Sequence, residues 1–236
     1  MKFKKILYAK DRKFYWKEGD LHTQFGLVKE NDIKSKSKAK SNKEIEFSIF
    51  DANITDQIDK IKRGPQVMLA KDIGFIIART GINKDSKVLE IGTGSGKTTI
   101  FLASIAKQVI SYEKRQDHFK LAKTNLKEFN FNNIKLINKD ASEGIKEKNF
   151  DAAVIDVQEP WTLISNVENS LKSGSYIVSY CPSIPQITEL IKSLKESKLI
   201  SITELIQRDW NFENRAIHPK FKMLGHTGFL VLLRKI

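Results

Sequence analysis

The sequence predicts an α/β protein, with a mostly parallel central sheet covered by helices and a small β-rich domain before it. From Ile82 onward, short apolar runs alternate with amphipathic segments, as buried strands alternate with the helices that cover them. Before that point, short groups of β-branched and aromatic residues are separated by Gly19, Gly26 and polar runs, as in a small sheet with tight turns. We expect the small domain to span residues 1–63 and the α/β domain residues 64–236.

Hydrophobic periodicity predicts the strands and helices of the α/β domain. The predicted strands are residues 88–91, 109–113, 134–140, 152–156 and 176–182, and the predicted helices are residues 97–108, 115–130 and 187–198. Two further apolar runs, 200–210 and 226–236, have no helix between them. They predict two long strands that end the mostly parallel sheet in an antiparallel arrangement.

The chain is strongly basic. Lysine and arginine total 41 against 28 acidic residues, a formal charge of +13 that is spread over both predicted domains. Such a charge favours a polyanionic partner, and nucleic acid is a better candidate than a membrane. No apolar run approaches the roughly 20 residues that span a bilayer, and the lysine-rich first 20 residues lack the apolar segment of a secretory signal. We therefore expect a cytoplasmic protein.

Two other features of the composition bound the function. The lysine-rich run 34–43 is typical of a solvated or disordered hairpin loop, and a loop that contacts an RNA backbone is the alternative. Cys181 is the single cysteine, so no internal disulfide is possible, and the four histidines show no paired metal-ligand spacing. We expect no bound metal.

The segment GTGSGKTT, residues 92–99, joins a predicted strand to a predicted helix and has two interpretations. A phosphate-binding loop needs its first glycine five residues before Gly96-Lys97-Thr98, where this chain has Ile91, so the loop is one residue short. The apolar run that ends in Asp156 resembles a magnesium-binding strand and keeps a nucleotide triphosphatase open as an alternative.

The other interpretation is a loop that holds a nucleoside-containing methyl donor. Glu90 precedes the glycines, and the next predicted strand ends at Glu113, 21 residues after Gly92, where a carboxylate can accept hydrogen bonds from both ribose hydroxyls. The spacing G-x-G-x-G differs from the dinucleotide fingerprint. Glu90 to Gly96 resembles the E-x-G-x-G-x-G motif of class I S-adenosylmethionine-dependent methyltransferases, a family with a Rossmann-like sheet and an antiparallel terminal strand.

Several further motifs, each weak alone, are similar to those of the tRNA adenine-58 N1-methyltransferase family. They are GDLHTQFG in the small domain, RGPQVMLAKD (63–72), DVQEPW (156–161), SYCPSIPQ (179–186) and GHTGFL (225–230). The resemblance covers nearly the full length. Gln158 stands where the family commonly has a proline, and the lysine-rich segment Ser35 to Ser41 is a second departure, expected in a loop.

The resemblance implies S-adenosylmethionine as cofactor, tRNA as substrate and the site residues. Asp156 would be the catalytic acid-base or electrostatic residue at the target adenine, and Tyr180 would shape the base pocket. The implied cofactor-binding residues are Gln66, Glu90, Gly92, Gly94, Ser95, Gly96, Glu113, Lys114, Asp140, Ala141 and Asp156. Plain structural roles remain open: Asp140 as a helix cap, Gln66 as a turn residue and Tyr180 as strand packing. His226 is expected in a turn rather than as a base.

The family also implies a homotetramer, and the chemistry implies base exposure. N1 lies on the Watson-Crick edge of adenine, so the target nucleotide must leave its stack, while lysines hold the tRNA by its phosphates. The alternatives are a non-catalytic tRNA-binding subunit of a methyltransferase complex, a phosphate-binding nucleotide triphosphatase, and a methyltransferase acting on protein carboxylates or DNA amino groups.

Overall fold

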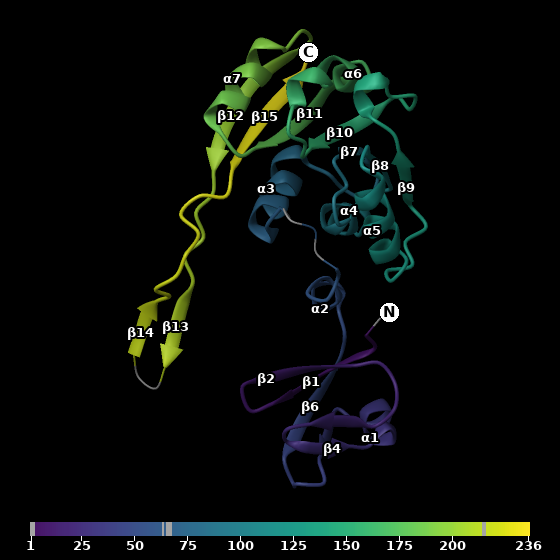
Figure 1. The fold of residues 1–236 in the computed structure, drawn as a ribbon, viewed down its shortest axis with the longest axis vertical. Helices are drawn as coiled ribbons and strands as arrows, with labels where there is room; N and C mark the ends of the chain where they lie inside the picture. The colour runs from purple at the N-terminus through teal and green to yellow at the C-terminus, as the bar shows by residue number, and fades with distance from the viewer. Residues whose placement is uncertain (1–2, 63, 65–67, 214–215) are drawn as a thin grey trace. The chain divides into compact units, whose positions relative to one another are not determined.

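The computed structural model describes residues 3–62, 64, 68–213 and 216–236. The chain divides into two compact units, Met1–Lys62 and Arg63–Ile236 (Figure 1). In the described part of the chain, no helix has the length and apolar character needed to cross a membrane.

The first unit is built on a four-stranded antiparallel sheet of order β2-β1-β6-β5, which confirms the β-rich expectation. Its elements are β1 (Lys5–Ala9), β2 (Arg12–Trp16), β3 (Leu21–Thr23), β4 (Gly26–Val28), α1 (Glu30–Ser35), β5 (Lys38–Lys40), β6 (Glu46–Asp51) and α2 (Ile54–Ile58). Strands β3 and β4 form a separate short ribbon. Leu7, Phe47 and Ile33 are fully buried and pack in one small core beneath the sheet.

The expected solvated hairpin loop is confirmed only for Asn42 and Lys43, which are exposed in the turn between β5 and β6, and the lysine-rich run as a whole is not a disordered loop. It forms the end of α1 and all of β5, where Ala39 is buried between two exposed lysines. The side chains of Lys34, Lys36, Lys38 and Lys40 form ion pairs with Glu30, Asp32, Glu46 and Glu44, respectively. The run takes an ordered structure because its period-two alternation suits an edge strand, where exposed lysines also discourage pairing with other chains.

The second unit contains a seven-stranded sheet of order β12-β15-β11-β10-β7-β8-β9 (Figure 1). The strands are β7 (Lys87–Ile91), β8 (Gln108–Glu113), β9 (Ile134–Asn138), β10 (Phe150–Ile155), β11 (Leu171–Cys181), β12 (Ser197–Glu204) and β15 (Phe229–Lys235). Strands β9, β8, β7, β10 and β11 are parallel, whereas β15 pairs antiparallel with both β11 and β12. The predicted antiparallel ending is therefore confirmed.

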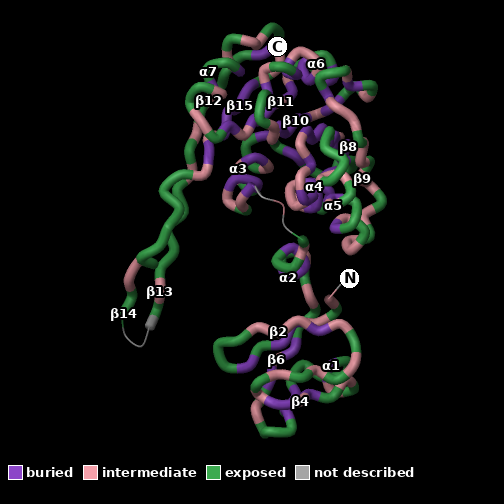
Figure 2. The backbone as a smooth tube through the Cα atoms, in the orientation of Figure 1, coloured by how far each residue is buried: buried purple, intermediate pink, exposed green. Residues whose placement is uncertain are grey.

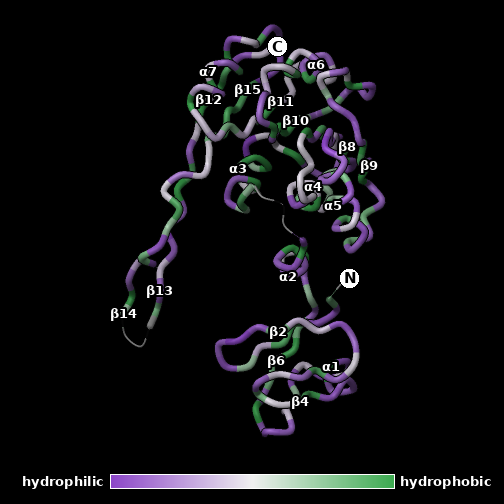
Figure 3. The backbone as a smooth tube through the Cα atoms, in the orientation of Figure 1, coloured by the Kyte–Doolittle hydropathy of each residue, from purple (hydrophilic) through white to green (hydrophobic). Residues whose placement is uncertain are grey.

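Helices cover both faces of this sheet, as the alternation of its strands requires. The elements are α3 (Ala70–Thr80), α4 (Lys97–Ala103), α5 (Gln116–Leu126), α6 (Ile164–Glu168), α7 (Ile184–Lys192) and two single turns, η1 (Ala141–Glu143) and η2 (Pro160–Thr162). Leu89 and Ile91 of β7 face the core that includes α6 and α7, and Val88 faces the core that includes α3 and α4. The buried strands lie inside these layers (Figure 2), and hydrophobic stretches run along the central strands and along α3 (Figure 3).

Periodicity predicted one strand over residues 200–210, and that prediction is wrong. Strand β12 ends at Glu204, and Trp210 begins a separate hairpin of β13 (Trp210–Glu213) and β14 (Ala216–Pro219). Among the described strands, β13 and β14 pair only with each other. Periodicity failed here because an exposed apolar strand has the same pattern as a buried one. We call residues 205–224 the arm.

Candidate functional site

The carboxyl ends of three neighbouring parallel strands bring three carboxylates to one edge of the sheet. In the order β10-β7-β8, Asp156 follows β10, Glu90 lies near the end of β7 and Glu113 is the last residue of β8. Ligands of open α/β sheets bind outside this edge. The glycine loop, residues 92–96, leaves β7 at the same edge and leads into α4.

Each glycine of the loop is required for a different physical reason. An added Cβ on Gly92 would lie 2.0 Å from the main-chain carbonyl oxygen of Asp156, so Gly92 lets the loop pack directly against the end of β10. Gly94 has a φ of 55° and no atom within 4 Å of an added Cβ, so open space lies beside it. Gly96 is the N-cap of α4 in the left-handed conformation. Close approach of the backbone to a ligand therefore fits Gly94 better than Gly92.

Glu113 is held in place by two backbone amides. Its Oε2 accepts a hydrogen bond from the amide of Gly94 (2.9 Å), and its Oε1 accepts one from the amide of Arg115 (2.9 Å). The residue is 5% exposed. The carboxylate at the end of β8 is thus fixed directly beside the glycine loop.

Glu90 is fully enclosed and only half satisfied. Its Oε2 accepts a hydrogen bond from the hydroxyl of Thr99 on α4 (2.6 Å), whereas Oε1 is buried with no partner in the described part of the chain. Burial raises the pKa of Glu90 to about 7, and the hydroxyls of Ser111 and Thr99 oppose that shift. An orphaned, enclosed carboxylate oxygen behind a glycine loop marks a place where a ligand donor or a water could complete the hydrogen bonding.

Asp156 is half-buried at the end of β10, and its position is fixed by the backbone. Its amide donates to the carbonyl of Ile91 on the neighbouring strand (2.8 Å). Within the described residues its carboxylate makes no hydrogen bond or ion pair, in contrast to Glu113. Burial, and then the charge of Glu113, raise the pKa of Asp156 to about 6.

Asp140 has the capping role that was one of its two predicted roles. Its Oδ1 accepts a hydrogen bond from the amide of Ser142 (2.9 Å) at the start of η1, and this bond lowers the pKa of Asp140. The other oxygen lies 4.0 Å from the ammonium of Lys114. Ala141 is buried next to it, and its carbonyl accepts from the Asn166 side chain (3.0 Å).

Tyr180 ends up beside Asp156. Ile155 and Ser179 are register partners on β10 and β11, so the next residues, Asp156 and Tyr180, emerge on the same face. The phenol of Tyr180 donates a hydrogen bond to the carbonyl of Thr227, and burial raises the pKa of Tyr180.

The remaining residues of the predicted site are either undescribed or anchor the glycine loop. Gln66 lies outside the described residues. Ser95 is buried, and its carbonyl accepts from Asn125 of α5 (2.8 Å), which anchors the loop to that helix. The ammonium of Lys97 donates to the carbonyl of Met68 (3.1 Å). Sequence motifs did not indicate Thr99. Its hydroxyl on α4 bonds to Glu90 on β7, and no spacing rule predicts that contact.

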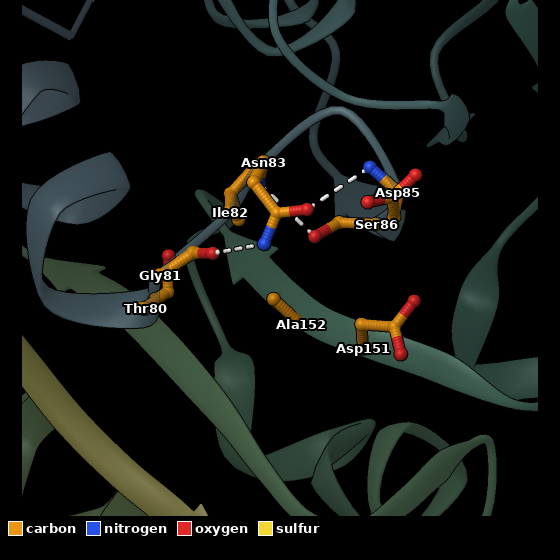
Figure 4. Close-up of a pocket in the computed structure, with 8 residues that line it drawn as sticks. All are labelled: Thr80, Gly81, Ile82, Asn83, Asp85, Ser86, Asp151 and Ala152. Carbon is orange, nitrogen blue, oxygen red and sulfur yellow. Dashed lines mark hydrogen bonds between the residues drawn. The ribbon is translucent and has the colours of Figure 1, made fainter.

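A hollow lies at the opposite edge of the sheet from the glycine loop (Figure 4). This cavity, of about 230 Å³, is lined by Thr80, Gly81, Ile82, Asn83, Asp85, Ser86, Asp151 and Ala152. Residues 151 and 152 lie at the start of β10, whereas Asp156 follows its other end. Because ligands of parallel sheets bind at the carboxyl ends of the strands, the hollow is not the site formed by the glycine loop.

Comparisons with known proteins agree with this geometry. The family model described as "tRNA methyltransferase complex GCD14 subunit" matches residues 57–225. The tRNA (adenine(57)-N(1)/adenine(58)-N(1))-methyltransferase TrmI of Methanocaldococcus jannaschii is 33% identical over 90% of this chain and 86% of its own. The tRNA (adenine(58)-N(1))-methyltransferase TrmI of Thermus thermophilus is 30% identical over 80% of this chain and 77% of its own.

Solved structures show the same likeness. The tRNA (m1A58) methyltransferase TrmI from Aquifex aeolicus superposes with a TM-score of 0.82 at 27% identity, covering 100% of this chain and 98% of its own. A structure titled SAM-dependent O-methyltransferase from Thermotoga maritima has a TM-score of 0.85 at 27% identity, covering 99% and 93%. The predicted class I methyltransferase fold is confirmed. The chain belongs to the family of the tRNA methyltransferase complex GCD14 subunit, as its motifs indicated.

Proposed function

We propose that the protein transfers a methyl group from S-adenosylmethionine to N1 of adenine 58 in the T-loop of tRNA. The observation that carries the proposal is that two different carboxylates lie at the same edge of the sheet. Glu113 is fixed beside the glycine loop, whereas Asp156 is desolvated and has no partner among the described residues. The family and the names of its relatives supply the substrate class. One relative is named for both adenines 57 and 58, so methylation of the neighbouring adenosine belongs to the proposal.

The residues at this edge fit S-adenosylmethionine. Glu113 would accept hydrogen bonds from the ribose hydroxyls, and Asp140 with Ala141 and Lys114 would border the adenine. The loop residues Gly92, Gly94, Ser95 and Gly96 would run along the cofactor, with the open space beside Gly94 available to it. The orphaned oxygen of Glu90 leaves an acceptor for a cofactor donor. Gln66 stays a candidate on sequence grounds. The bound cofactor supplies an electrophilic methyl group on a sulfonium.

Asp156 would act on the other reactant. N1 of adenine carries a lone pair, so transfer depends on alignment more than on removal of a proton, and the methylated ring becomes cationic. The Asp156 carboxylate can accept a hydrogen bond from the exocyclic amine of adenine and so stabilise the developing positive charge. Tyr180, on the same face of the sheet, would border the base and restrict its orientation. We assign catalysis to Asp156 and Tyr180.

The charge of +13 suits a tRNA substrate, and with that substrate we propose the cytoplasm as the compartment of the protein. Lysines would hold the tRNA by its phosphates, while the pocket at Asp156 reads one extruded base. The lysines of the run 34–40 contribute less than their number suggests, because each is already paired with a carboxylate.

A homotetramer is the assembly that we propose, and the arm supports it. On one face of the hairpin, Trp210, Phe212 and Ile217 are each more than half exposed. A two-stranded hairpin is marginal in water unless its apolar face is covered. A second copy would cover it in a symmetric contact. Light scattering should give four times the chain mass, and a single chain mass at working concentration would contradict the proposal.

The test of the function is methyl transfer from labelled S-adenosylmethionine to unmodified tRNA, followed by digestion and mass spectrometry of the nucleosides. We expect 1-methyladenosine in the T-loop, and a matched tRNA with guanosine at position 58 separates that position from its neighbour. Cofactor and tRNA binding without any methylated product would favour the non-catalytic subunit. Absence of cofactor binding would overturn the assignment of the glycine loop.

A further inference from the structure

The turn formed by residues 225–228, which leads into β15, holds the ring of Tyr180. The phenol donates its hydrogen bond to the carbonyl of Thr227. An added Cβ on Gly228 would lie 2.5 Å from Cζ of Tyr180, so the ring occupies the space of an absent side chain. The backbone of the turn therefore sets the position of Tyr180 at the end of β11.

Lys71 fixes this turn from the first turn of α3. Its ammonium donates to the hydroxyl of Thr227 (2.9 Å) and to Oδ1 of Asp72 (2.7 Å). The lysine side chain is 13% exposed, and Asp72 is fully buried with an Oδ2 that has no partner among the described residues. A desolvated ion pair that also bonds a hydroxyl 156 residues away joins α3 to the turn.

His226 ties the same turn to the end of β12 and to Pro182, the residue after β11. Its Nδ1 lies 2.5 Å from a carboxylate oxygen of Glu204 on β12, and its Nε2 lies 2.9 Å from the carbonyl of Pro182. Both partners are acceptors, so this geometry favours the imidazolium, in which both ring nitrogens can donate. The hydrogen bond to Glu204 raises the pKa of His226, while the charge of Lys71 opposes that shift. The ring also packs 5.0 Å from the ring of Phe229.

We propose that Lys71 and His226 are positioning residues for methyl transfer, acting through the turn 225–228 on Tyr180. The inference rests on the proposed function, because it assumes that Tyr180 borders the target adenine beside Asp156. Neither residue needs to touch the substrate. Their contribution is to keep the turn, and with it the phenol, in one place while the base enters, which is the kind of alignment on which transfer to N1 depends.

The experiment combines kinetics with a double-mutant cycle. Lys71→Met and His226→Phe remove the hydrogen bonds and keep most of the side-chain volume, and Lys71→Arg is the conservative variant. At saturating tRNA, we expect Lys71→Met to lower the single-turnover rate about tenfold, and His226→Phe somewhat less, with cofactor affinity unchanged. Lys71→Arg should recover part of the loss. Lys192→Met, which removes an exposed pair with Glu189, is the matched control and should leave the rate unchanged.

The decisive comparison uses Tyr180→Phe, which removes the bond to Thr227. If Lys71 acts through Tyr180, Lys71→Met should cost little in the Tyr180→Phe background. An equal loss in both backgrounds would overturn the inference, as would an unchanged rate in Lys71→Met. Hydrogen exchange of the amides of residues 226–229 should accelerate in Lys71→Met, and this readout does not depend on activity. Inactive wild-type protein would count against the proposed function, whereas unchanged exchange would count against the positioning role.

Discussion

Glu113 and Asp156 end strands on either side of β7, yet the protein treats the two carboxylates in opposite ways. Both oxygens of Glu113 accept hydrogen bonds from backbone amides of the loop and of Arg115. Within the described residues, the carboxylate of Asp156 accepts none, although it is desolvated enough for its pKa to rise to about 6. One carboxylate is fixed before any ligand arrives, and the other is left to be satisfied by a ligand.

This difference separates binding from chemistry. A buried carboxylate without a partner raises the free energy of the folded protein, and such groups occur where a substrate or reaction uses them. A fixed carboxylate instead presents its remaining lone pairs in a constant direction, which suits recognition of a cofactor that the enzyme binds in every turnover. Substitutions at the two positions should therefore affect different measurements.

The largest expected effect is that of Asp156→Ala. We expect methyl transfer at saturating substrates to slow by about 10² or more, the scale of losing one positioned electrostatic group. Calorimetry should show S-adenosylmethionine affinity close to that of the wild type. Asp156→Asn keeps a neutral acceptor, so its transfer rate should lie between those of Asp156→Ala and the wild type. Unchanged turnover in Asp156→Ala would remove this residue from the catalytic role.

Glu113→Ala should show the reverse behaviour. We expect the dissociation constant for S-adenosylmethionine to rise about 10- to 100-fold, the range for losing hydrogen bonds to a charged group. The rate at saturating cofactor should change less than the affinity. Glu143→Ala, which removes an exposed carboxylate near Asp140, is the control and should leave the affinity unchanged. An unaltered affinity in Glu113→Ala would contradict the ribose assignment.

A third prediction concerns pH. In its proposed role Asp156 acts as a carboxylate, and its raised pKa means that this form is lost as the pH falls through about 6. The transfer rate should therefore be level above about pH 7 and fall about tenfold per pH unit well below 6. Asp156→Asn should abolish this dependence, whereas Glu90→Gln should keep it. A dependence that survives in Asp156→Asn would assign the titration to another group.

Much of the site was predictable from the chain because its residues stand at strand ends. Glu113 and Asp156 each close an apolar run, and parallel strands bring their carboxyl ends to one edge. The contrast between them was not predictable, because it depends on which amides and charges lie nearby in space. The same limit applies to Gly92. A side chain is excluded there by the carbonyl of Asp156, which is 64 residues away in the chain.

The arm and the lysine run show where local patterns are ambiguous. The run 200–210 has the apolar pattern of a buried strand, yet Trp210 lies in a hairpin that has no third strand among the described residues. The run 34–43 has the composition of a disordered loop, yet the buried Ala39 holds it in a sheet. Composition averages over neighbours and cannot show which side of a strand meets a core.

The smallest expected effect concerns stability and Glu90, which lies on β7 between the strands that end near Asp156 and Glu113. Burial raises the pKa of Glu90 to about 7, so the folded protein binds a proton more tightly than the unfolded chain does, with its pKa near 4.5. The contribution of Glu90 to stability should therefore fall as the pH rises from about 4.5 to 7, and stay level above that range. Glu90→Gln keeps an acceptor for Thr99 and removes the buried charge. Its melting temperature should exceed that of the wild type by a few degrees at pH 8, at about 2–4 °C per kcal/mol, and match it near pH 4. Glu143→Gln, at an exposed site, should show no such difference. If Glu90→Gln is less stable than the wild type at pH 8, the ionised Glu90 carboxylate must have a partner that stabilises it. Glu90 would then resemble Glu113, whose carboxylate is held by two backbone amides.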